Sequence, residues 1–233
     1  MTTFEEIFCD RIWNKNLLEK SNFKCSRINE AIKMLNNGNR LLDVGCGEGT
    51  FLNLAKKNYN YVFGIDLSIE ALKSACRKNF TVIKNNINNE GIPFHKETFD
   101  AVTCLDVIEH IYDPVWLLSE IYRVLKRNGL VILSTPNVRF IEFVSKILLK
   151  GRFPKTSDDL HTYNGGHINY FTFRDIKNLL SNVGFKILED KGIAYRPYRT
   201  FKIRIFRAVM KLWEKEIEKE FFSKGIIVKA QKN

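Results

Sequence analysis

The chain has 233 residues and a formal net charge of +11, from 37 lysine and arginine against 26 aspartate and glutamate residues. That length suits one domain with a buried core, and 45% apolar and 27% charged residues are ordinary globular values. These values exclude a disordered chain, a collagen-like chain and a disulfide-stabilised miniprotein. The sequence contains no run of about 18 apolar residues, which would predict a membrane span. It also contains no basic region followed by an apolar run, which would predict a secretory signal.

Five cysteines are present in the chain, and no two of them have the C-x-x-C spacing. An odd number without such pairs predicts neither a disulfide framework nor a zinc ribbon. Isolated cysteines are typical of buried thiols in a reducing compartment, so the sequence favours a cytoplasmic protein.

Strands and helices are predicted to alternate along the chain. Helical periodicity indicates two N-terminal helices, at residues 3–18 and 21–35. The predicted strands are residues 40–44, 61–66, 80–83, 99–105 and 130–133. The helices between them are residues 48–57, a segment capped by Ser68, and residues 114–126, which Asp113 and Pro114 open. This alternation is typical of a parallel sheet with helices on both faces, whose sites lie at the carboxyl ends of the strands.

The C-terminal part of the chain is less regular. A helical segment at residues 138–149 precedes a long loop at residues 151–170. Loops of that length inside a domain are usually functional or mobile. A helix at residues 173–183 and a strand at residues 185–188 follow. There is no internal repeat and no Gly/Ser linker, so we predict a single domain over residues 1–233.

A glycine-rich loop joins the first predicted strand to the next helix. Residues 41–50 read Leu-Leu-Asp-Val-Gly-Cys-Gly-Glu-Gly-Thr. Three glycines let the backbone turn sharply and let a ligand approach bare main chain. The spacing is G-x-G-x-G, whereas dinucleotide-binding loops have G-x-G-x-x-G. Asp66 ends the second strand, where a carboxylate can accept hydrogen bonds from ribose hydroxyls, so the pattern favours a nucleoside cofactor over an ordinary tight turn.

These motifs resemble those of class I S-adenosylmethionine (SAM) dependent methyltransferases. Residues 41–50 are similar to the first motif of that superfamily. The other matching segments are, in chain order, residues 64–68, 99–110, 123–130, 166–172 and 183–185. The last two segments are similar to those of the small-molecule branch, which includes the quinone-ring O-methyltransferases.

The resemblance implies a Rossmann-like α/β fold. Its seven-stranded, mostly parallel sheet would have helices on both faces and an antiparallel edge strand, formed by residues 225–230. The single domain would comprise a helical cap (residues 1–37), a SAM-binding core (38–135) and a substrate-side region (136–233). The implied activity is methyl transfer from SAM to a small molecule, at a hydroxyl oxygen. A quinone precursor, a glycan sugar and a secondary metabolite are the candidate acceptors.

The cofactor residues can be carried over position by position. Asp43, Gly45 and Gly47 would line the methionine part of SAM, Asp66 would bind the ribose, and Leu67 would flank the adenine.

Two further positions complete the predicted cofactor site. Leu105 would lie near the sulfonium. Asn86 stands where the family usually has an aspartate that faces the adenine amino group. The carbonyl oxygen of asparagine keeps an acceptor for that hydrogen bond.

The methyl acceptor needs groups of its own. SAM already carries an excellent leaving group, so the enzyme chiefly aligns the acceptor and excludes water. A hydroxyl acceptor also benefits from a general base. We predict catalytic roles for His167, in the long loop, and for His110 and Asp106, which follow the fourth strand. Alternatively, His167 is an ordinary loop residue that hydrogen-bonds to the backbone.

Asp106, Glu109 and His110 also match an acidic, acidic, histidine trio that is associated with a divalent cation in quinone-type relatives. Such a cation would lower the pKa of an acceptor hydroxyl. The Glu-His pair also occurs in members without a metal, where it orders the loop. We favour the second interpretation and predict no metal.

The positive charge is concentrated at the C-terminus, because residues 191–233 hold 12 basic and four acidic side chains. Residues 199–222 predict an amphipathic helix with aromatic residues on one face and lysine and arginine on the other, as in peripheral membrane helices. We favour packing on the sheet or on a second subunit over membrane contact. Motifs of DNA methyltransferases are absent, so we predict no nucleic-acid partner.

Two rival functions remain open from the sequence. A nicotinamide-dependent dehydrogenase has a similar sheet, although the glycine spacing opposes it. A non-catalytic SAM-binding protein that regulates a partner would carry the same cofactor motifs.

Overall fold

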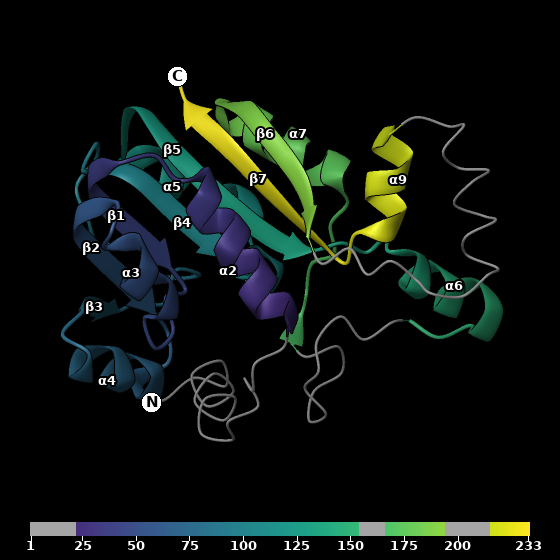
Figure 1. Ribbon diagram of the computed structural model, residues 1–233, viewed down its shortest axis with the longest axis horizontal. Coiled ribbons are helices and arrows are strands. Elements are labelled where there is room, and N and C mark those ends of the chain that lie inside the picture. The colour runs from purple at the N-terminus through teal and green to yellow at the C-terminus, as the bar shows by residue number, and fades with distance from the viewer. Residues whose placement is uncertain (1–21, 154–165, 194–214) are drawn as a thin grey trace.

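The computed structural model describes residues 22–153, 166–193 and 215–233 (Figure 1). Along the chain, its elements are α2 (Asn22–Met34), β1 (Gly38–Val44), α3 (Thr50–Ala55), β2 (Tyr59–Asp66), α4 (Ile69–Arg77), β3 (Thr81–Lys84), β4 (Phe99–Leu105), the 3-10 helix η1 (Ile108–His110), α5 (Pro114–Val124), β5 (Leu125–Pro136), α6 (Ile141–Lys150), α7 (Phe173–Val183), β6 (Phe185–Ile193), α9 (Lys215–Phe222) and β7 (Gly225–Lys232). The predicted helix at residues 3–18 lies outside the described residues. Residues 199–214 of the predicted basic helix also lie outside them.

One seven-stranded sheet organises the molecule, with the strand order β3-β2-β1-β4-β5-β7-β6. The pairs from β3 to β5 are parallel, and β7 is antiparallel to both of its neighbours, β5 and β6. The predicted α/β fold class is therefore confirmed. The edge position predicted for residues 225–230 is wrong: β7 pairs with β5 on one side and with β6 on the other, so β6 is the edge strand on that side.

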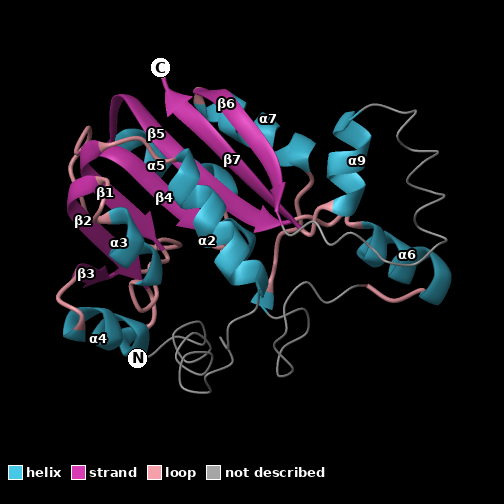
Figure 2. Cartoon of the chain, viewed as in Figure 1, coloured by secondary structure: helices cyan, strands magenta, loops and turns pink. Residues whose placement is uncertain are grey.

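Helices cover both faces of the sheet, as Figure 2 shows for α2 and α3 on one side and α5 and α7 on the other. Two apolar cores result, and neighbouring residues of one strand belong to different cores. Leu41 packs in the core with α2 and α3, and Leu42 in the core with α5 and α7. A strand that is buried on both faces is apolar at most of its positions, which explains the nearly continuous apolar runs in the sequence.

Local capping fixes where several helices begin. The Ser68 hydroxyl accepts from the Ala71 backbone N–H, and the Asp113 carboxylate accepts from the backbone N–H groups of Val115 and Trp116, just after Pro114. Both predicted helix starts are confirmed. Strand β5 begins at Leu125, directly after α5, so the helix predicted to reach residue 126 is shorter and the strand much longer. None of the helices in the described part of the chain is long and apolar enough to cross a membrane.

Candidate active site

The glycine loop follows β1 at the carboxyl edge of the sheet. Gly45, Gly47 and Gly49 all have positive φ angles, of 75°, 53° and 80°, which side chains rarely adopt. A Cβ atom on Gly45 would overlap Cγ2 of Val107, and one on Gly49 would lie 2.6 Å from Cδ2 of Phe80. Both the backbone and its surroundings therefore require glycine in this loop.

Asp66 ends β2 and binds the glycine loop directly. The Gly47 N–H donates to Oδ2 of Asp66 and the Ser68 N–H donates to Oδ1, each at 2.8 Å. The carboxylate thus holds the loop after β1 beside the start of α4. Because a carboxylate has about four lone-pair sites, these two bonds are compatible with hydrogen bonds to ribose hydroxyls.

Asp43 is buried beneath the loop, at the end of β1. Its Oδ1 accepts from the Thr103 hydroxyl at 2.7 Å. Burial raises the pKa of Asp43 to about 7, the Thr103 hydrogen bond opposes that rise, and the charge of Asp66 adds to it. A cationic group nearby, such as the ammonium of SAM, would favour the charged form of Asp43.

Asp43 should make the unliganded protein less stable as the pH rises. Its folded pKa of about 7 exceeds its ordinary value of 3.8. The folded state therefore binds more protons than the unfolded state between these values, and stability present at low pH is lost as the pH rises through 7. Without SAM, the melting temperature of the wild type should fall more between pH 6 and pH 8 than that of Asp43→Asn. Equal falls in both proteins would refute the buried-acid account.

The predicted adenine side lies after β3. Asn86 is buried, its Oδ1 accepts from the Asn88 N–H at 3.1 Å, and its own N–H donates to Glu90. A carbonyl oxygen has two lone pairs, so this local turn leaves adenine recognition chemically feasible. Leu67 and Leu105 are half-buried at the ends of β2 and β4, on the same edge of the sheet.

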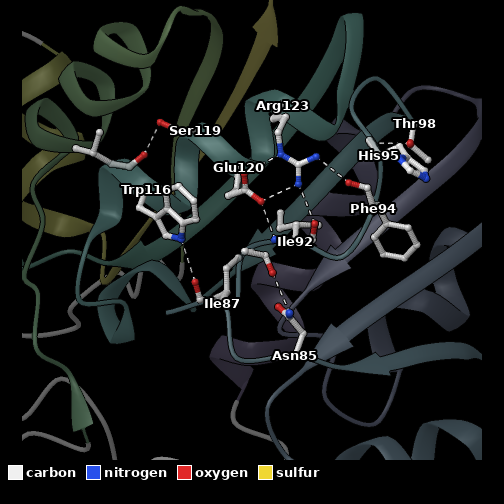
Figure 3. A network of polar contacts seen from close by, with 12 residues as sticks. Asn85, Ile87, Ile92, Phe94, His95, Thr98, Trp116, Ser119, Glu120 and Arg123 are labelled. Atoms are coloured by element: carbon white, nitrogen blue, oxygen red, sulfur yellow. Dashed lines mark hydrogen bonds and ion pairs between the residues drawn. The ribbon is translucent and has the colours of Figure 1, made fainter. Parts of the chain in front are cut away.

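An ion pair holds the segment between β3 and β4 in place (Figure 3). The Arg123 guanidinium bonds to both oxygens of Glu120, and it donates to the carbonyls of Ile92 and Phe94 at 2.8 and 2.7 Å. Glu120 in turn accepts from the Ile92 N–H at 2.7 Å. The hydrogen bond from Arg123 is the main cause of the lowered pKa of Glu120. This network fixes the path of the chain that follows Asn86.

A buried ion pair lies at the end of β4. Asp106 has a positive φ of 55°, accepts from the Ser134 hydroxyl at 3.0 Å and forms an ion pair with Arg27 of α2. Arg27 is itself buried, and burial lowers its pKa to about 10. The ion pair therefore joins the N-terminal helix to the strand end where the reacting groups are predicted.

His110 and His167 come together beside this ion pair. Their ring centroids are 4.6 Å apart at an angle of 79°. Nδ1 of His110 lies 3.1 Å from the Gly166 carbonyl, and because a carbonyl only accepts, that nitrogen carries the proton. Burial lowers the pKa of both rings, that of His167 to about 3 with a further contribution from His110 and Arg27. Both histidines are thus neutral near pH 7.

Glu109 completes the cluster. Its Oε2 accepts from the Thr135 hydroxyl at 3.1 Å, and its Oε1 has no hydrogen-bond partner among the described residues. Its backbone carbonyl accepts from the N–H groups of Ile168 and Asn169, which anchors the end of the long loop. Burial raises the pKa of Glu109 to about 7. His95, by contrast, is exposed.

Comparison with known proteins shows the family to which the chain belongs. A family model described as a methyltransferase domain matches residues 17–190. The chain belongs to this methyltransferase family. It is 27% identical over 217 residues to an uncharacterized protein of Methanocaldococcus jannaschii, covering 86% of this chain and 80% of that protein.

Two further similarities bear on the class of methyltransferase. A ubiquinone biosynthesis O-methyltransferase of Psychrobacter arcticus is 27% identical over 176 residues, which is 69% of this chain and 64% of the relative, just under two thirds. The fold matches the crystal structure of a SAM-dependent methyltransferase of Thermotoga maritima with a TM-score of 0.67 at 18% identity, covering 98% and 99% of the two chains. Membership of this methyltransferase family gives SAM as the cofactor. The dehydrogenase and the non-catalytic alternatives are set aside.

The trio that the methyltransferase brings together differs from the predicted metal trio. Among the described residues, Glu109, His110 and His167 have potential ligand atoms within 4.8 Å of one another. Asp106 is not one of them, because its carboxylate pairs with Arg27. A carboxylate and two imidazoles suit a transition metal in kind. The buried positive charge of Arg27 beside them opposes a cation, and we derive no step through one.

Sequence reasoning missed two contributors to the methyltransferase site. Arg27 is an ordinary helical arginine in the sequence, and its partner Asp106 is distant along the chain. Arg123 and Glu120 carry only the i, i+3 spacing of many surface ion pairs. Their role depends on backbone carbonyls that the fold brings to them.

Proposed function

We propose that this methyltransferase transfers the SAM methyl group to a hydroxyl oxygen of a small molecule. The cluster of Glu109, His110 and His167 carries the proposal, because neutral imidazoles and a carboxylate with a pKa of about 7 can accept the proton that a hydroxyl nucleophile must lose. The relatives named as ubiquinone biosynthesis O-methyltransferases support a phenolic acceptor, such as a quinone precursor. Glycan sugars and secondary metabolites offer the same hydroxyl chemistry.

In the proposed cofactor site, the glycine loop holds the methionine part of SAM. Gly45 and Gly47 present bare backbone to it, and Asp43 lies below with its carboxylate buried. Asp66 binds the ribose while it holds the loop through the Gly47 N–H.

The adenine lies between Leu67 and Asn86, and Leu105 lies beside the sulfonium. All three stand at or directly after the carboxyl ends of β2, β3 and β4, the edge where sheets of this type bind ligands.

His167 is the proposed general base. Its low pKa keeps the ring neutral and leaves it a weak base, so it accepts the proton as the methyl group moves rather than before. Glu109, with a pKa near 7, is the stronger acceptor within reach of the ring. His110 is a positioning residue, because its ring packs against His167 and its Nδ1–H holds the loop at Gly166. Asp106 orients this end of β4 through Arg27.

His167→Ala should lower the turnover number, by at most the about 10²–10⁴-fold that a general base usually contributes, because a ring with a pKa of about 3 is a weak base. The affinity for SAM should be unchanged, because the ring is assigned to the acceptor. The assay measures release of S-adenosylhomocysteine with a panel of catechols, phenols and sugar alcohols, alongside amines and thiols. Calorimetry with SAM gives the affinity.

His95→Ala is the matched control, since His95 is exposed and should leave turnover unchanged. Methylation of amines alone would contradict transfer to oxygen. Full turnover by His167→Ala on a hydroxyl acceptor would remove His167 as the base without affecting the cofactor assignment.

A further inference from the structure

The end of α6 carries the most exposed aliphatic side chains among the described residues. Leu148 and Leu149 are 76% and 83% exposed, and Ile147 and Phe153 beside them are also exposed. We call residues 147–153 the α6 tip. Figure 1 shows α6 at one end of the molecule, beyond the carboxyl end of β5. Apolar side chains gathered on a projecting element indicate a surface that binds a protein or a membrane.

The base of α6 is firmly held, so the tip is presented on a fixed support. Phe140 and Phe143 are buried, with ring centroids 5.5 Å apart. Just before α6, the Asn137 side chain donates to the carbonyls of Glu220 and Ser223 at 2.6 and 2.8 Å. Arg139 forms an ion pair with Glu220 of α9. The apolar residues near the start of α6 thus belong to the core, and those of the tip do not.

The positive charge at the end of α6 favours an anionic partner. Residues 143–153 contain Lys146, Lys150 and Arg152 and no acidic residue. Lys146 lies 3.6 Å from Glu142, one turn earlier, whereas Lys150 and Arg152 are exposed at the tip itself. Leucine and phenylalanine flanked by basic residues are the composition of segments that lie in the interface of anionic membranes. A second copy of the chain is disfavoured, because each copy carries a net charge of +11.

We propose that the α6 tip binds the surface of an anionic lipid bilayer, with Leu148 and Leu149 in the headgroup region and Lys150 and Arg152 on lipid phosphates. The proposal is independent of the acceptor. The tip is nevertheless in contact with the segment that carries His167. The ring centroids of Phe153 and Tyr170 are 4.8 Å apart, and the Tyr170 hydroxyl donates to the His167 carbonyl. A bound membrane would therefore lie close to the proposed site of methyl transfer.

Co-sedimentation of the full-length protein with vesicles tests the proposal. The wild type should bind vesicles of phosphatidylcholine mixed with phosphatidylglycerol at low salt, and should not bind pure phosphatidylcholine. Leu148→Ser/Leu149→Ser should weaken binding at least tenfold, because binding scales with the apolar area inserted. Lys150→Glu/Arg152→Glu should weaken vesicle binding by about fivefold or more for each positive charge that is removed.

Matched controls separate the tip from general charge and general apolarity. Lys56→Glu/Lys57→Glu changes the net charge as much as Lys150→Glu/Arg152→Glu does, at an exposed site after α3. Tyr112→Ser removes an exposed, largely apolar side chain away from the tip. Both should bind as the wild type does, and melting curves should show all variants folded. No binding of the wild type to anionic vesicles would overturn the proposal, as would equal loss in the lysine control. A wild-type dimer in size-exclusion chromatography that Leu148→Ser/Leu149→Ser dissociates, without vesicle binding, would assign the tip to a second copy instead.

Discussion

Asp66→Ala should abolish measurable SAM binding. The substitution removes the proposed ribose acceptor and also the carboxylate that holds the Gly47 and Ser68 N–H groups at 2.8 Å. Hydrogen bonds to a charged group contribute about 1.5–3 kcal/mol each, so the loss of two to the ribose alone weakens binding by about 10²–10⁴-fold. Isothermal titration calorimetry with SAM measures the effect directly.

Asp100→Ala is the matched control for Asp66→Ala. Asp100 also accepts from two backbone N–H groups, those of Asn39 and Arg40, and it pairs with Lys126, but it stands at the opposite end of the sheet. Its loss should cost stability of about 1–3 kcal/mol and leave SAM affinity unchanged. Near-normal affinity in Asp66→Ala, or equal loss in the two variants, would contradict the assignment of Asp66 to the cofactor.

Gly45→Ala should destabilise the fold and prevent SAM binding together. An alanine at a φ of 75° costs about 1–2 kcal/mol, and the overlap of its methyl group with Val107 costs about 1–3 kcal/mol more. The loop must move to relieve that overlap, and the bare backbone proposed to face the methionine part of SAM moves with it. Urea unfolding and calorimetry with SAM measure the two effects on the same protein.

Gly151→Ala separates the backbone cost from the overlap. Gly151 has a φ of 56°, and a Cβ atom there meets no atom within 4 Å. This variant should lose only about 1–2 kcal/mol and should bind SAM normally. Val107→Ala should restore part of the stability of Gly45→Ala, since it removes the overlapping methyl groups. A Gly45→Ala variant no less stable than Gly151→Ala would show that the crowding at Val107 has no energetic weight.

The sheet and the glycine loop could be predicted because their signals are local. Leu41, Leu42 and Val44 are apolar and pack in the two cores, since the strand is buried on both faces. Gly45 and Gly49 stand where other side chains do not fit. Ser68 and Asp113 cap the helices that directly follow them. Each of these features is decided by a few consecutive residues, and the sequence therefore predicts it.

The remaining features depend on contacts between distant segments. The place of β7 between β5 and β6 follows from pairing across much of the chain, for example of Ser134 with Ile227. Arg27 meets Asp106 only after α2 packs on the sheet. The contact between His110 and His167 likewise forms through Gly166 and the backbone of Glu109. Residue types suggested candidates at these positions, and only the fold shows which of them come together.

A crystal structure with bound S-adenosylhomocysteine tests the central assignment most directly. The homocysteine part should lie against the backbone of residues 45–47, and both ribose hydroxyls should lie within hydrogen-bonding distance of the Asp66 carboxylate. The sulfur should point toward Leu105, with His167 on the side where an acceptor oxygen would enter. The ligand bound elsewhere, or ribose hydroxyls held by other residues with Asp66 turned away, would contradict the account.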